Sequence, residues 1–142
     1  MITTEEIAVV VYQKLMQSDV AELLSGGEID YERNDYSKAG IIIVPHTIEG
    51  EGSVRNGQVN VNIHVPDLLK GGTNNPVYRI NYPKMIQLKK AVIEVLRNHF
   101  ESGEGWNWSI GLINPLMKEV GHNEHFVSLA LEVTVRDKTN RQ

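Results

Sequence analysis

The chain has 142 residues, no cysteine, and 18 acidic against 14 basic side chains, which gives a formal net charge of −4. The absence of cysteine excludes disulfides and thiolate metal sites, and the acidic balance lacks the basic footprint of a nucleic-acid-binding protein. No apolar run approaches the roughly 20 residues that a membrane-spanning helix requires, and the N-terminus lacks the features of a signal peptide. We expect a single domain over residues 1–142 of a soluble protein, with a frayed polar tail at 137–142.

The first predicted element is a helix over residues 5–17. Thr3 and Glu6 have the spacing of a capping box, in which each side chain accepts a hydrogen bond from the backbone N–H of the other residue. A short second turn is expected over residues 20–24, and Ser25-Gly26-Gly27 ends it. The helix is expected to pack through apolar positions at helical intervals, which are Ile7, Val10, Val11 and Leu15.

Strands are predicted next, over residues 28–32 and 41–44. The second of these is β-branched throughout, which favours a strand covered on both faces. Strict alternation of polar and apolar residues over 58–65 predicts a strand with one buried face. Asn56-Gly57, just before it, is a type I′ turn signal. We therefore expect a hairpin whose other strand spans residues 48–55.

Residues 66–82 have no clear period and predict a long loop, of the kind that is usually functional or disordered in a compact domain. Pro83 suits the first turn of a helix, which we expect to run to Phe100 and to end near Ser102-Gly103. Beside its main apolar face lies a second apolar row, formed by Ile86, Ile93 and Phe100. The two rows together are broader than packing on one sheet requires. A contact with a neighbouring subunit explains the second row, and a helix sunk deeply in its own domain is the alternative.

Two alternating stretches close the chain, one around Trp106, Trp108 and Ile110 and one over residues 127–135. Both are predicted to be strands. The predicted fold class is α+β, with a mixed, mostly antiparallel sheet of about five strands packed by the N-terminal helix and one long amphipathic helix.

The sequence contains no clear catalytic constellation. His122 and His125 flank Glu124, but residues at i and i+3 of an extended chain point apart, and a zinc site needs three or four protein ligands. His46 and His64 are candidates to meet across the predicted hairpin. Four nearby carboxylates suggest a magnesium nuclease, although the wet face of a short strand explains them as well; they are Glu28, Asp30, Glu32 and Asp35. We expect surface histidines, no metal site and no cofactor.

Trp106 and Trp108 are the remaining candidates for binding. Aromatic side chains on an open sheet can stack bases or dock a partner. Few Lys or Arg residues flank this pair. Packing inside the protein is the simpler interpretation.

The predicted elements follow one another in an order that carries a resemblance. An N-terminal helix and a short turn reach Leu24, and Gly26-Gly27-Glu28-Ile29-Asp30-Tyr31 leads into a strand. The hairpin to Val65, the helix from Pro83 to Phe100 and the closing strands follow. In element order, size and mixed α/β pattern, nearly the whole chain resembles the tail-terminator and tail-to-head joining proteins of tailed bacteriophages. The long loop at 66–82 departs from that pattern and leaves open whether the chain resembles a terminator or another neck or adaptor component.

This resemblance implies a structural protein. Such subunits assemble into rings, usually hexameric, at the head–tail junction of the virion, and they catalyse nothing. The ring meets other connector and tail proteins and leaves a channel through which double-stranded DNA passes without sequence-specific binding. It implies no membrane contact, no cofactor and a location in the virion after assembly in the host cytoplasm.

We place the expected subunit interface at Ile86, Ile93 and Phe100, and contacts with other virion proteins at Val77, Tyr78 and Ile80. Two alternatives remain. One is a small metal-dependent hydrolase or nuclease that uses Asp30, Glu32, His46 or His64. The other is a cellular protein-binding module that uses the sheet face around Trp106 and Trp108.

Overall fold

The structure is a computed structural model that describes residues 2–48, 50, 53–71, 74–97 and 105–136, and the backbone alone of residues 99–101. The predicted tail at 137–142 lies outside the described residues. In chain order the elements are α1 (Thr4–Met16), α2 (Val20–Leu23), β1 (Glu28–Asp30), β2 (Gly40–Pro45), β3 (Val54–Pro66), β4 (Leu68–Lys70), β5 (Val77–Arg79), α3 (Tyr82–Val95), β6 (His99–Glu101), β7 (Trp106–Ile113), β8 (Met117–Lys118) and β9 (Glu124–Arg136).

Seven of these strands form one sheet, in the order β1-β2-β3-β9-β7-β6 with β8 also paired to β9. β1 pairs with β2 in parallel, and the other pairs of this sheet are antiparallel. β3 and β9 form its centre because they pair along their whole length, from Val54 opposite Arg136 to Pro66 opposite Glu124. The predicted α+β class with a mixed, mostly antiparallel sheet is confirmed, although the sheet has more strands than the five expected.

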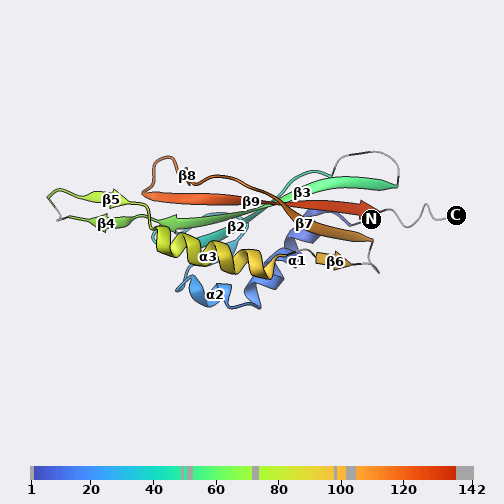
Figure 1. The fold of residues 1–142 in the computed structure, drawn as a ribbon, viewed down its shortest axis with the longest axis horizontal. Coiled ribbons are helices and arrows are strands. Elements are labelled where there is room, and N and C mark those ends of the chain that lie inside the picture. Colours follow the sequence, from blue (N-terminus) through green and yellow to red (C-terminus); the bar gives the residue numbers. More distant parts are fainter. Residues whose placement is uncertain are drawn as a thin grey trace.

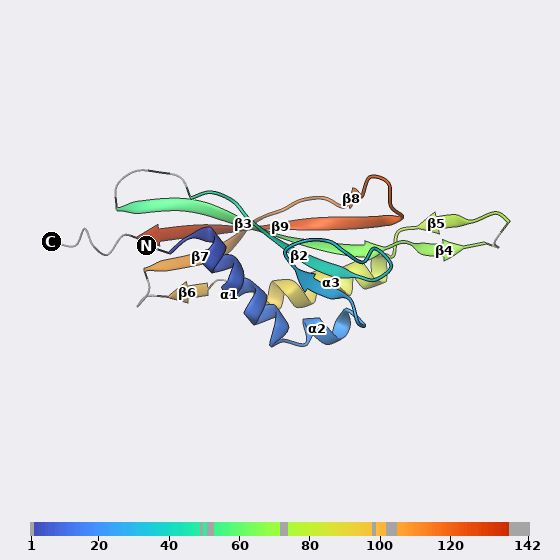
Figure 2. The same ribbon diagram turned by 180° about the vertical axis from the view of Figure 1, so that it is seen from behind.

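The helices α1, α2 and α3 lie on one side of this sheet, as both views show (Figures 1 and 2). The hydrophobic core lies between them and the sheet. β3 and β9 supply the alternate side chains that the sequence pattern predicted to be buried, which are Val59, Val61, Ile63, Val65, Val127, Leu129, Leu131, Val133 and Val135. β2 is buried at Ile41, Ile42 and Ile43, as expected for a strand covered on both faces.

α1 begins where the sequence predicted. The backbone N–H of Glu6 donates to Oγ1 of Thr3 at 3.2 Å, and the backbone N–H of Thr3 donates to Oε1 of Glu6 at 3.2 Å, so both bonds of the capping box form. α1 buries Ile7, Val11 and Leu15 against the sheet. The chain leaves α2 through Ser25, whose φ of 53° ends helical backbone.

The turn predicted at Asn56-Gly57 is wrong, because both residues lie inside β3, opposite Thr134 and Val133 of β9. The chain reverses earlier, between Pro45 and Val54, and β2 pairs with the later part of β3. Gly57 serves packing here: a Cβ added to it would lie 2.9 Å from the side chain of Ile48. A glycine that makes room for a crossing side chain has the same sequence signature as a turn glycine.

The predicted extension of the late helix to Phe100 is also wrong. α3 ends at Val95, and Phe100 lies in β6, where its backbone pairs with Asn107. The indole Nε1 of Trp108 donates to the backbone oxygens of Leu96 at 3.0 Å and Arg97 at 3.2 Å. Those carbonyls are the acceptors that a continuing helix would use, so a residue from β7 caps α3.

The long loop predicted at 66–82 is wrong as well, since residues 68–70 and 77–79 form the hairpin β4–β5. This hairpin projects beyond one end of the large sheet in both views (Figures 1 and 2). Between β7 and β9, the short strand β8 pairs with the start of β9. Among the described residues, no helix has both the length and the apolar character needed to cross a membrane.

Candidate assembly surfaces and a buried ionic cluster

The β4–β5 hairpin, which we call the arm (residues 67–80), exposes apolar side chains on both of its faces. The register pairs Leu69 with Tyr78, so these two share one face. The other face carries two cations and two apolar residues, which are Leu68, Lys70, Val77 and Arg79. Exposure is 58% at Leu69 and 45% at both Val77 and Tyr78. A two-stranded hairpin of this size is marginally stable alone, so its exposed apolar side chains suit a contact with a partner.

The base of the arm is fixed to the end of the large sheet. Oδ1 of Asp67 lies 2.7 Å from Nδ1 of His125, and its Oδ2 lies 3.7 Å from Nζ of Lys118. The backbone N–H of Asp67 also donates to the carbonyl of Asn123 at 2.8 Å. The arm is therefore anchored at its root.

A second apolar surface lies on α1 and the residue that follows β1. We call it the α1 patch and define it by Val9, Tyr12, Met16 and Tyr31. The rings of Tyr12 and Tyr31 stack with centroids 5.6 Å apart, which joins the helix to the edge of the sheet. Val9, Met16 and Tyr31 are each more than 40% exposed. Burial, with Tyr12 and Asp30 nearby, raises the pKa of the Tyr31 hydroxyl, so it stays neutral at pH 7.

Three acidic residues adjoin residues of the α1 patch, one along the helix and two along the chain. Glu5 lies four residues before Val9 on the same stripe of α1, and Glu32 follows Tyr31; both are exposed. Asp30 is half-buried and accepts the Tyr31 backbone N–H at 2.7 Å. None of these three carboxylates forms an ion pair within the described part of the chain, so the patch has an unneutralised negative border.

A cluster of charged side chains is buried at the end of the sheet from which the arm projects. Glu124 is fully buried at the start of β9. Its Oε1 accepts a hydrogen bond from Nη2 of Arg33 at 2.6 Å, and its Oε2 lies 2.8 Å from Nδ1 of His64. Arg33 also reaches Oε1 of Glu28 at 3.3 Å. This arrangement satisfies the buried carboxylate, which would otherwise be strongly destabilising.

The cluster shifts the titration of its carboxylates. Burial by itself raises the pKa of Glu124, but its hydrogen bonds with His64 and Arg33 and the positive charge of Arg33 outweigh burial, so that pKa lies below its usual value. The pKa of Glu28 is lowered in the same way: burial raises it, and the backbone N–H groups of Asn34 and Asp35 and the guanidinium of Arg33 lower it more. Both carboxylates are therefore charged at neutral pH.

Two residues of this cluster, His64 and Glu124, also belong to a possible metal site with Glu119. Ligand atoms of the three residues lie within 4.8 Å of one another, and no other such group of three occurs among the described residues. Both oxygens of Glu124 are already engaged, one by Arg33 and one by His64. Arg33 thus supplies the positive charge that a divalent cation would bring. An ion-paired structural cluster describes these contacts better than a metal centre.

Neither pair of histidines considered in the sequence comes together. His64 lies opposite Gly40 in the β2–β3 register, whereas the backbone N–H of His46, beyond the other end of β2, donates to Gln58. The expectation that His46 and His64 meet across the hairpin is therefore wrong. His122 stacks on Tyr36 with ring centroids 3.6 Å apart, and His125 binds Asp67. His122 and His125 therefore take separate partners, as their spacing in extended chain predicted.

Of the four carboxylates considered for a nuclease, two hold a loop together, Glu28 and Asp35. Glu28 accepts the backbone N–H groups of Asn34 and Asp35 at 2.7 and 3.1 Å. Asp35 in turn accepts the backbone N–H of Ser37 at 3.0 Å. Asp30 accepts a bond from its neighbour, and Glu32 is exposed. Of these four carboxylates, only Glu28 is linked to His64, through Arg33 and Glu124. The residues considered for a hydrolase or nuclease therefore do not come together; they are Asp30, Glu32, His46 and His64.

The interface residues predicted on the late helix are separated. Ile86 is 49% exposed on α3, whereas Ile93 is partly buried and packs against the core. Phe100 lies in β6, and its side chain is outside the described residues. They do not form one helical row. Of the predicted partner contacts, Val77 and Tyr78 are exposed on the arm, and Ile80 is half-buried at its root.

Trp106 and Trp108 are buried, with exposures of 5% and 1%. They face the helices together with the core residues of β9, to which β7 pairs. These two indoles are therefore not available to a binding partner on the sheet surface. The simpler interpretation, that they pack inside the protein, is confirmed.

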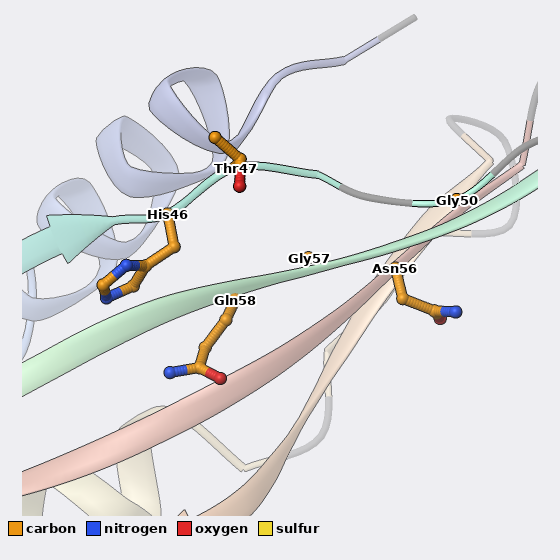
Figure 3. A pocket seen from close by; sticks show the side chains of 6 residues that line it. All are labelled: His46, Thr47, Gly50, Asn56, Gly57 and Gln58. Carbon is orange, nitrogen blue, oxygen red and sulfur yellow. The ribbon is translucent and has the colours of Figure 1, made fainter.

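A cavity of about 630 Å³ lies where the chain leaves β2 and passes β3. Figure 3 shows His46 and Thr47 on the departing segment, and Asn56, Gly57 and Gln58 in succession along β3. Among the described residues its lining contains no carboxylate and no Lys or Arg; those residues are His46, Thr47, Gly50, Asn56, Gly57 and Gln58. The described lining offers hydrogen-bonding groups without a partnered acid, base or nucleophile.

No protein-family model matches this sequence, and no curated protein matches it significantly. The surfaces and the cluster therefore carry the functional argument.

Proposed function

We propose that this chain is a structural subunit of a tailed-bacteriophage virion, located at the head–tail junction as a tail terminator or as a neck or adaptor component. Copies associate into a closed ring, a hexamer or larger, which binds other connector and tail proteins. The subunit has no catalytic role and needs no cofactor. The resemblance in element order supports this proposal.

The observation that carries the proposal is the arm. It exposes Leu69 and Tyr78 on one face and Val77 on the other, on a hairpin with three paired residues in each strand. Exposed apolar side chains on a projecting hairpin are costly to a protein that stays alone in solution, since they invite association. In an assembly protein the same side chains are buried by neighbouring subunits.

The charge of the chain suits passage of DNA through the ring. A formal net charge of −4 gives little attraction to phosphates, and tight nucleic-acid binding depends on clustered Lys and Arg. DNA can therefore slide past the subunits without being held.

Two measurements test the proposal. Light scattering at several protein concentrations should show the mass rising to a fixed multiple of the chain mass. Electron microscopy of assembled particles that carry a tagged copy should place the tag at the head–tail junction. A tag elsewhere in the particle, or a tag missing from purified particles, contradicts the proposal.

The alternative of a metal-dependent hydrolase rests on the proximity of His64, Glu119 and Glu124. Metal analysis of the purified protein separates the two functions. Stoichiometric, tightly bound divalent metal, together with a turnover lost on replacing Glu119, would favour the enzyme. We expect neither, because Arg33 and His64 already occupy the carboxylate of Glu124.

A further inference from the structure

We infer that the cationic face of the arm docks on the α1 patch of a second copy of this chain. The inference rests on the proposed function, because it requires that copies of the chain associate. It goes further by identifying the two surfaces that meet. The contact pairs Leu68, Lys70, Val77 and Arg79 of one copy with Val9, Tyr12, Met16 and Tyr31 of the next, bordered by Glu5, Asp30 and Glu32.

The first argument is charge complementarity. Residues 68–79 contain two cations, Lys70 and Arg79, and no acidic residue. Removing these two charges from the total of −4 leaves −6 on the rest of the chain. Within the described residues neither cation forms an ion pair, so both are available to carboxylates of another molecule.

The second argument is the composition of the two surfaces. The arm presents Leu68 across from Arg79 and Val77 across from Lys70, and the two apolar side chains are 41% and 45% exposed. The α1 patch presents Val9, Met16 and Tyr31, with exposures of 44%, 46% and 41%, beside unpaired carboxylates. Each surface therefore combines exposed apolar side chains with charged ones, and the charges on the two surfaces have opposite sign. Interfaces commonly combine a desolvated apolar core with a polar rim in this way.

The third argument is placement. In both views the arm projects from one end of the molecule, while α1 begins near the opposite end and runs under the sheet (Figures 1 and 2). The arm points away from the body of its own copy, so it is positioned to meet α1 of a neighbour. A contact between two different surfaces is heterologous, and repeating it builds a ring or a filament.

The docked face leaves the other face of the arm free. Leu69 and Tyr78 lie on that opposite face, with exposures of 58% and 45%. They remain available for the contacts with other virion proteins proposed above.

Charge reversal tests the contact. Arg79→Glu and, separately, Glu32→Lys should each weaken self-association about tenfold or more, since each places like charges opposite one another. Combining both changes in one chain should restore association toward the wild-type level. Lys90→Glu, at an exposed position on α3 that belongs to neither surface, should leave association unchanged. Sedimentation velocity at several concentrations measures the dissociation constant of each variant.

The altered side chains are exposed, so circular dichroism and thermal unfolding should match wild type and exclude misfolding as a cause. If wild type assembles and Arg79→Glu behaves like Lys90→Glu, the arm contact is wrong and the ring proposal stands. If wild type stays monomeric at every concentration, both are contradicted. Failure of the double variant to recover also overturns the pairing of Arg79 with the acidic border.

Discussion

Glu124 has no exposed surface, and its charge is stabilised by Arg33 and His64. The pKa of this carboxyl is lowered in the folded protein, so the unfolded chain binds the proton more tightly than the native one. Its contribution to stability is therefore present above the ordinary pKa of 4.5 and is lost as pH falls through the lower folded value. Glu28 follows the same rule.

We therefore expect the free energy of unfolding of wild type to fall steadily below about pH 5. Glu124→Gln should be less stable than wild type at pH 7 and should lose less stability on acidification, because one titrating group has been removed. Glu94→Gln is the matched control, since its side chain is 71% exposed and its ion pair is with an arginine that is itself exposed, Arg97. Urea unfolding at intervals from pH 7 to pH 3 gives the three curves. Parallel curves for Glu124→Gln and wild type would show that Glu124 is not a titrating contributor.

The sequence gives no local signal for this cluster. Arg33 and Glu124 lie 91 positions apart and meet only because loop 31–39 reaches the start of β9. In the sequence Glu124 stands between His122 and His125. The histidine that binds it is a third one, His64 on β3. Local spacing predicts which side of a strand a residue occupies, and it does not predict which loop covers that side.

At the scale of elements, the predictions that succeeded rested on signals contained within the element. The capping box fixed the start of α1, and strict alternation fixed the buried faces of β3 and β9. The failures depended on the surroundings of the element. The strands of the arm have no buried face, so they carry no alternation, and the carbonyls at the end of α3 are bound by Trp108 from another strand.

The hydrogen bonds from Trp108 to the end of α3 should contribute measurably to stability. Trp108→Phe keeps an aromatic ring in the core but leaves the carbonyls of Leu96 and Arg97 without the indole donor, and it should cost about 1–3 kcal/mol of unfolding free energy. Ser109→Ala, an exposed position in the same strand, should change stability by less than about 0.5 kcal/mol. Urea denaturation provides both values. Equal, small effects would mean that the indole bonds do not hold the end of α3.

At the scale of the whole molecule, the arm and the α1 patch occupy different places on one chain. If each copy gives its arm to one neighbour and receives an arm from another, growth stops only when the chain of contacts closes on itself. Closure depends on the angle between successive copies, which a single subunit does not specify. This is the part of the proposed function that neither sequence pattern nor subunit fold predicts.

A mixing experiment tests whether the contact is one-directional. In the first chain, residues 70–77 are replaced by Asn-Gly, a two-residue turn that suits the paired Leu69 and Tyr78 and removes the tip of the arm. The second chain carries Glu32→Lys and keeps its arm. Each alone should stay monomeric, with thermal unfolding close to wild type because the described residues from 70 to 77 are all exposed.

Mixed in equal amounts, these two chains retain one working arm and one working patch between them. Size-exclusion chromatography with light scattering should then show a pair of one copy of each, and nothing larger, under conditions in which wild type forms its full assembly. Growth beyond the pair would reveal a further contact that assembles the protein without the arm. A mixture that stays monomeric while wild type assembles would show that arm and patch do not meet.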